Sequence, residues 1–188
     1  MNDLMNLRGH VKIFKVHNNK RELIVDKNNL IVYIGREWIL PKIVNTDNVN
    51  ISPTIDLFIS WISFGKGGAP VNSPLDPIPP ASTDIGLNSE HIIGDINTYA
   101  DGGKKKAFDS IEFIQDDLNA NRYLGMRISS YLDESELVDQ DINEAGLWLS
   151  DSNNVSTATE FHLFSKTTFA TVRKQSNFAL HVLWYIYS

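Results

Sequence analysis

Two stretches of the chain carry oxygen ligands at spacings similar to those of calcium-binding loops. In residues 95–99 an Asp and an Asn occupy loop positions one and three, but Tyr99 occupies position five. Residues 139–143 supply Asp, Asp and Asn at positions one, three and five. Glu144 then replaces the turn glycine, and Ser150 replaces the bidentate glutamate. Neither stretch is therefore an EF-hand. A solvated acidic loop and a calcium site of another kind both stay open, and we assign no metal ligand.

The remaining groups that could perform catalysis lack the required spacing. Residues 133–139 hold four carboxylates, but closeness in sequence does not set the separation that a glycosidase pair needs. No GxSxG motif is present. The five histidines form no pair at i, i+2 or i, i+4: they are His10, His17, His91, His162 and His181. Gly65, Gly67 and Gly68 match neither phosphate-binding fingerprint, because Ala69 and Pro70 follow them. We therefore predict a protein that is not an enzyme and binds no cofactor.

The composition of the chain disfavours some classes of partner and location for the protein. The formal net charge of −6 disfavours nucleic acid, which needs clustered positive charge. The absence of cysteine excludes disulfides and thiolate metal sites, and it fits synthesis in a reducing cytoplasm. No apolar run reaches the length of a membrane span or of a signal peptide. The 188 residues suit one domain covering 1–188.

The elements that must position any site are mainly strands. Residues 10–17 and 22–26 predict an N-terminal hairpin, and residues 57–64 predict a central strand. Residues 30–41 repeat apolar side chains at i, i+4 and i+8, which predicts one helix, although the same residues also suit a strand. With the strands further along the chain, about eight are expected. The pattern is typical of an antiparallel sandwich or barrel, and we favour a β-sandwich.

The last third of the chain gives the strongest strand signals. Residues 122–132 alternate apolar and polar side chains, as in a half-buried antiparallel strand. The final block, residues 178–186, puts Trp184 on a uniformly apolar face that should meet the core. Tyr185 and Tyr187 lie on the other face, and we expect them at a subunit interface or on the sheet exterior.

Two further segments are candidate interfaces. Residues 69–84 contain five of the seven prolines: Pro70, Pro74, Pro77, Pro79 and Pro80. Such a segment prefers an extended polyproline II conformation, so it is either a surface loop or an arm that lies on another subunit. Lys104, Lys105 and Lys106 form the chain's single basic run, which either decorates a hairpin tip or meets an acidic patch on a partner.

Three motifs in order give the chain a family resemblance. They are DKNNLIVYIGREWI near the start, ISWISFGKGGAP followed by STDIGLNSE, and INEAGLWLSD followed by FHLFSKTTFATVRKQSNFALHVLWYIYS. Together they resemble a group of small virion structural proteins of tailed bacteriophages. In INEAGLW, Glu144 is expected to accept backbone hydrogens at a sheet corner, and Gly146 to permit a tight turn or bulge. Both roles are structural.

The resemblance implies a non-enzymatic virion component that contacts other virion proteins and copies of itself. Its expected place is the tail, baseplate or fibre-attachment apparatus, with neck, collar or capsid decoration as the alternative. A different class, a carbohydrate-binding β-sandwich that binds host glycan, would use tryptophan faces: Trp38, Trp61, Trp148 and Trp184. A small hydrolase that uses the acidic loop residues is a third alternative.

Overall fold

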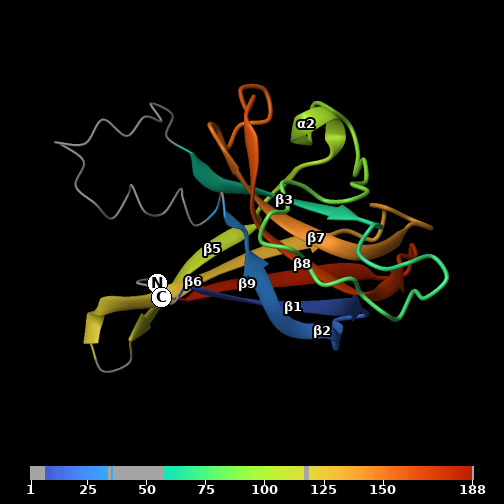
Figure 1. The fold of residues 1–188 in the computed structure, drawn as a ribbon, viewed down its shortest axis with the longest axis horizontal. Coiled ribbons are helices and arrows are strands. Elements are labelled where there is room, and N and C mark those ends of the chain that lie inside the picture. The colour runs from blue at the N-terminus through green and yellow to red at the C-terminus, as the bar shows by residue number, and fades with distance from the viewer. Residues whose placement is uncertain (1–6, 34, 36–56, 117–118, 188) are drawn as a thin grey trace.

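The protein is a single antiparallel sheet that curls around its own core (Figure 1). The computed structural model describes residues 7–33, 35, 57–116 and 119–187. Its strands are β1 (Arg8–His17), β2 (Lys20–Ile31), β3 (Phe58–Gly65), β4 (Lys106–Ala107), β5 (Ser110–Asp116), β6 (Asn119–Leu132), β7 (Asp141–Ser150), β8 (Phe161–Arg173) and β9 (Ala179–Tyr187). They lie in the order β4-β3-β7-β8-β2-β1-β9-β6-β5, and every pair is antiparallel. The mainly β, antiparallel architecture is confirmed.

Strand β2 makes the sheet continuous. Residues 20–29 pair with β1 apart from a bulge at Ile24, and the last two residues, Leu30 and Ile31, pair with β8. The predicted hairpin turn is present: Asn18 and Asn19 both have positive φ, a conformation that asparagine tolerates. Leu30 was expected to begin a helix and lies in a strand instead. Its backbone N–H and C=O groups pair with β8 and are not free for a helix. Most of the remaining predicted helix lies outside the described residues.

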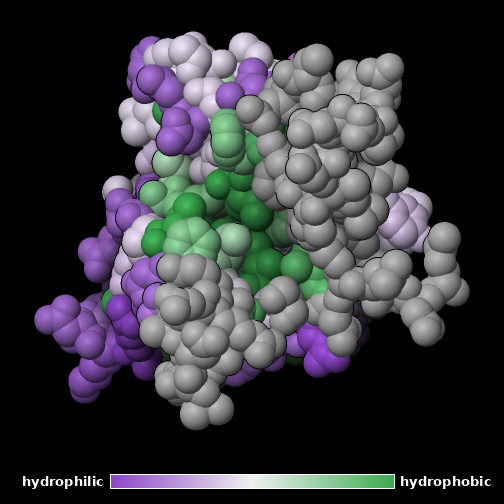
Figure 2. All heavy atoms as spheres, turned by 90° about the vertical axis from the view of Figure 1, so that its left-hand side faces the viewer, coloured by the Kyte–Doolittle hydropathy of each residue, from purple (hydrophilic) through white to green (hydrophobic). Residues whose placement is uncertain are grey.

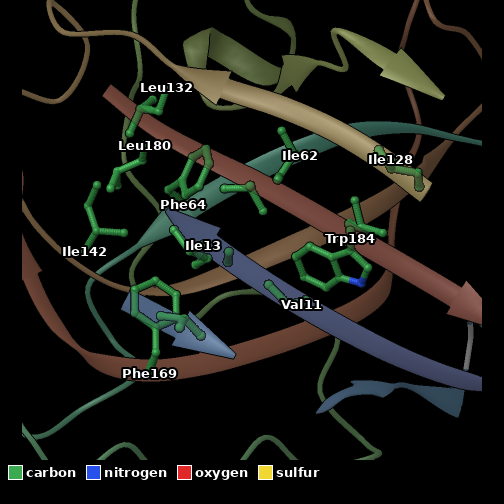
Figure 3. Packing of buried hydrophobic residues seen from close by; sticks show 14 of the residues in the cluster. Val11, Ile13, Ile62, Phe64, Ile128, Leu132, Ile142, Phe169, Leu180 and Trp184 are labelled. Carbon is green, nitrogen blue, oxygen red and sulfur yellow. The ribbon is translucent and has the colours of Figure 1, made fainter. Parts of the chain in front are cut away.

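The main core lies inside the curl (Figure 3). Strand β9 runs between β1 and β6, and its inward side chains are buried at every alternate position. Trp184 is fully buried there and packs with Val11 and Ile128 from the two neighbouring strands. The predicted two-faced terminal strand is therefore confirmed. The residues that the sequence assigned to the apolar face are all inside: Phe178, Leu180, Val182, Trp184 and Ile186.

A second, smaller core covers the outer face of the β3-β7-β8 half of the sheet. Trp61 and Trp148 are buried there with Val32, Ala100 and Leu163. Ala100 belongs to α2 (Ala100–Gly103), a single turn in which two residues have non-helical backbone angles. This half of the sheet is thus buried on both sides, whereas no described element packs over the outer face of the β1-β9-β6 half.

Glu144 joins two parts of the long connection between β3 and α2 to β7. Its side chain is fully buried and accepts hydrogen bonds from the backbone N–H groups of Gly67 at 2.9 Å, Asn88 at 3.0 Å and Ser89 at 2.8 Å. The expected role of Glu144 is therefore confirmed. Gly146, in contrast, lies within β7, where a Cβ would come 2.9 Å from the side chain of Leu163. The glycine therefore lies in a closely packed strand rather than in a turn, and a Cβ there would displace the end of the Leu163 side chain.

The proline-rich segment folds against its own domain. The carbonyl of Pro74 accepts the backbone N–H of Thr171 at 2.7 Å, and the carbonyl of Ile78 accepts the hydroxyl of Thr168 at 2.7 Å. Both threonines belong to β8, so the expectation that residues 69–84 leave their own domain is wrong. Proline lacks a backbone N–H but keeps its carbonyl, so a proline-rich segment can still accept hydrogen bonds, and β8 donates them here. Its contact with a further subunit through Pro70, Pro74, Pro77, Pro79 or Pro80 stays a prediction.

Candidate functional site

The outer face of the β1-β9-β6 half carries a group of aromatic rings, which we call the outer aromatic face. Its members are Phe14 on β1, Tyr131 on β6, and His181, Tyr185 and Tyr187 on β9. The pleat directs alternate residues of β9 outward while Trp184 points into the core. The ladder then aligns the rings, because His181 lies opposite both Phe14 and Tyr131. The exterior position predicted for Tyr185 and Tyr187 is observed.

His181 is the most enclosed member of this face. Its ring lies parallel to that of Tyr131, and Phe14 covers another side at 6.2 Å between centroids. Its Nε2 lies 2.9 Å from the hydroxyl oxygen of Ser129. Burial lowers the pKa of His181 to about 4, and the positive charge of Arg21 adds to the shift. The ring is therefore neutral near pH 7 and acts as a packing group.

Tyr185 and Tyr187 form the open part of the face. Their rings are parallel within 5°, with centroids 6.0 Å apart, and both side chains are half-buried. His10 flanks Tyr185 at 6.4 Å between ring centroids. Burial raises the pKa of Tyr187, so its hydroxyl stays protonated at neutral pH.

Polar and charged side chains border the two tyrosines on both sides. The His10 Nε2 lies 2.6 Å from an Asp26 carboxylate oxygen, and Arg127 pairs with Glu112 on the opposite edge. Aromatic rings that keep a polar tip suit contacts that bury one side and leave the other wet. The arrangement offers stacking and hydrogen bonding to a surface that contacts it. A hydroxyl and an imidazole, those of Ser129 and His181, also meet on this face, beside the ring of Tyr131.

The basic run of Lys104, Lys105 and Lys106 does not lie freely on the surface, where it was predicted. Lys105 is only 1% exposed, pairs with Glu90, and lies 3.1 Å from Asp101. Its ammonium also sits 3.7 Å from the centre of the Trp148 ring. The expectation that Lys105 meets a partner is therefore wrong, because the residue pairs with Ala100 just before β4 and its charge is satisfied internally. Lys106 pairs with Glu136 at 2.7 Å and is half-buried, as is Lys104.

The acidic side chains near residue 136 also serve the fold. Glu136 accepts hydrogen bonds from Lys106, from the Tyr99 hydroxyl and from the backbone N–H of Asp133. Burial together with Glu136 strongly raises the pKa of Tyr99. Asp95 caps its own turn through Asn97. Among the residues that the structure describes, no group of three His, Asp or Glu side chains could hold a metal ion.

The three tryptophans that the structure describes do not supply a glycan platform. Trp61, Trp148 and Trp184 are all buried, and Trp38 lies outside the described residues. The described helices also include none that is long and apolar enough to cross a membrane.

One cavity lies at the open seam of the sheet. It measures about 680 Å³ and lies between the beginnings of β3 and β5, with residues 151–153 alongside. Figure 2 shows apolar side chains gathered on this side of the molecule. Phe58 and Ile111 line the cavity and are about half exposed. Its walls are mainly apolar.

Sequence reasoning missed three members of the outer aromatic face. The alternation in residues 122–132 places Tyr131 on the polar side of its strand, which is a usable signal. Phe14 and His181 give no such signal, because their contact depends on β1 and β9 being neighbours across more than 160 residues of chain. No family model matches the chain, and no curated protein or solved structure is significantly similar to it.

Proposed function

We propose that the protein is a non-enzymatic structural component of a tailed-phage virion, in the tail, baseplate or fibre-attachment apparatus. It acts through contacts with other virion proteins and with copies of itself. The outer aromatic face carries this proposal, because it is built on the central strands and no described element packs over it. The other half of the sheet, in contrast, has its own covering layer.

The motifs behind the family resemblance support the proposal. Glu144 of the INEAGLW motif binds Gly67 of the GKGGAP motif and Ser89 of the GLNSE motif. Residues that the resemblance singles out thus hold the fold together. In this proposal the two halves of the curled sheet behave as the layers of a β-sandwich, with the outer aromatic face presented as the exterior of one layer.

Localisation and assembly test the proposal. Mass spectrometry of purified phage particles should find the chain in stoichiometric amount, and light scattering should show its self-association in solution. A Tyr185→Ser/Tyr187→Ser variant should lose assembly while keeping its thermal melt. The matched control is Ile96→Ser, which changes another exposed apolar residue. Absence of the chain from particles contradicts the virion role, and unchanged assembly of the double variant contradicts the role of this face.

The parallel rings of Tyr185 and Tyr187 favour one second candidate, a glycan-binding surface. Aromatic faces stack on sugar rings, and the bordering polar and charged side chains offer donors and acceptors for hydroxyl groups. In this candidate, Tyr185 and Tyr187 take the stacking role that the sequence had assigned to tryptophans. A monomer that binds a glycan array, and loses that binding in Tyr185→Ser, would support it over the assembly role.

A further inference from the structure

A buried cluster of polar side chains surrounds Lys166 in the middle of β8. The lysine is 1% exposed, and its Nζ lies 3.2 Å from the side-chain oxygen of Asn88. A carboxylate oxygen of the fully buried Glu144 lies 3.6 Å from the same nitrogen. Asp84 lies at 3.2 Å and the Gly86 carbonyl at 3.3 Å. A buried primary amine and a buried carboxylate thus meet the carboxamide of an exposed asparagine.

The amide of Asn88 is held in one orientation beside the amine. Its Nδ2 donates to the carbonyl of Gly67 at 3.0 Å, so its oxygen faces Lys166 and its nitrogen points away. The backbone N–H of Asn88 donates to Glu144 at 3.0 Å, which keeps the carboxylate beside both reactants. The asparagine belongs to the loop that Glu144 fixes, and the lysine belongs to a rigid strand. Holding reactants in this way replaces much of the entropy cost of bringing them together.

We propose that Lys166 and Asn88 form an intramolecular isopeptide bond, with Glu144 as the proton carrier. Glu144 takes a proton from the ammonium of Lys166, and the neutral amine attacks the side-chain carbonyl carbon of Asn88. The new C–N bond forms as the carbonyl π pair moves to oxygen, giving a tetrahedral intermediate. Glu144 then gives its proton to the amide nitrogen, and the C–NH₂ bond breaks as the carbonyl re-forms. The second amine proton passes to Glu144 and from it to the released ammonia, which leaves as ammonium, so Glu144 ends in its starting state. No oxidant or reductant is needed.

The surroundings suit each part of this reaction. The low exposure of Lys166 and Glu144 keeps competing water from the amine and the carboxylate. Asn88 lies on the exposed side of the cluster, which gives ammonia a route to solvent. The Asp84 carboxylate is the other acyl group near the amine, but direct attack on an ionised carboxylate is disfavoured relative to attack on an amide. The bond joins residues 78 positions apart and ties the loop before β4 to the sheet.

The mass of the intact protein tests the proposal directly. The purified full chain, denatured and measured by mass spectrometry, should be lighter than its sequence by the mass of one ammonia. Trypsin should not cleave after Lys166, and a branched peptide should join residues 67–104 to residues 128–173. Fragmentation should place the branch at Asn88 and Lys166. A full sequence mass after prolonged incubation of the folded protein overturns the proposal. Loss of one water with a branch at Asp84 also overturns it.

Variants separate the roles of the three residues. Lys166→Met and Asn88→Ala should show their full sequence masses. The control Asn153→Ala should keep the mass deficit of one ammonia, because that asparagine is exposed and does not belong to the cluster around Lys166. Glu144→Gln should fold with an altered melt and form the bond at least tenfold more slowly, as expected for loss of a general base. Bond formation at the wild-type rate in a folded Glu144→Gln protein removes Glu144 from the mechanism. If Glu144→Gln does not fold, the wild-type mass and the Asn88→Ala mass still decide whether the bond exists.

Discussion

The ring of His181 lies face to face with the ring of Tyr131, with centroids 4.0 Å apart and planes within 3°. The two residues are separated by 50 positions in the chain and meet because β9 pairs with β6. Arg21 donates to the Tyr131 hydroxyl at 2.8 Å and so fixes the outer ring. The stack holds a titratable ring in an enclosed site, and this gives the outer face a defined response to pH.

Stability should fall on acidification because of His181. The folded-state pKa of about 4 lies below the ordinary value of 6.5, so protons bind the unfolded state more tightly. The stabilising contribution is complete above pH 6.5 and is lost progressively as the pH falls towards 4. In His181→Phe, the free energy of unfolding measured with urea should therefore change less between these two pH values than it does in the wild type. The control is His162→Phe, which replaces an exposed histidine. An unchanged pH slope in His181→Phe contradicts the assignment.

Removal of the Trp184 side chain should cost about 3–5 kcal/mol of folding free energy, because it leaves a large cavity between β1 and β6. Tyr187→Ala on the outer face of the same strand should cost much less in the monomer. Urea denaturation of both variants measures the difference. Small and equal losses would mean that β9 is not central to the fold.

The basic run should show a sharp difference between neighbours. Lys105→Ala leaves Glu90 and Asp101 without their cation and removes the contact with Trp148, so it should cost about 2 kcal/mol. Lys104→Ala, one position earlier, should stay within about 0.5 kcal/mol of wild type, as is usual for residues without such contacts. Thermal and urea unfolding of the two variants provide the comparison, and equal losses would contradict the buried role of Lys105.

The attachment of the proline-rich segment can be tested at a single hydroxyl. Thr168→Val removes the hydrogen bond to the Ile78 carbonyl and should cost about 1 kcal/mol. It should also speed limited proteolysis within residues 69–84. Thr167 is the matched control: its hydroxyl is buried and has no hydrogen-bond partner among the described residues. Thr167→Val should therefore be neutral or stabilising, and faster proteolysis in that variant would argue against the attachment.

Local pattern was enough for several elements. Strict alternation in residues 122–132 and 178–186 predicted both faces of β6 and β9, because a strand directs successive side chains to opposite sides. Glu144 was expected to accept backbone hydrogens at a sheet corner, but its donors, which lie far from it in the chain, were not identified. Residues 30–31 were assigned to the wrong element, since the same apolar residues suit a helix or a strand until a partner strand is known.

The mainly β character, the apolar faces and the two sides of β9 follow from the order of residues along the chain. The neighbours of each strand emerge only in the folded chain, and they bring about the stack of His181 on Tyr131, the burial of Lys105 and the meeting of Lys166 with Asn88. Alternation and turn preference act over a few residues. Pairing of β1 with β9, or of a loop with β8, depends on the burial of the whole core and on the hydrogen bonds of distant backbone.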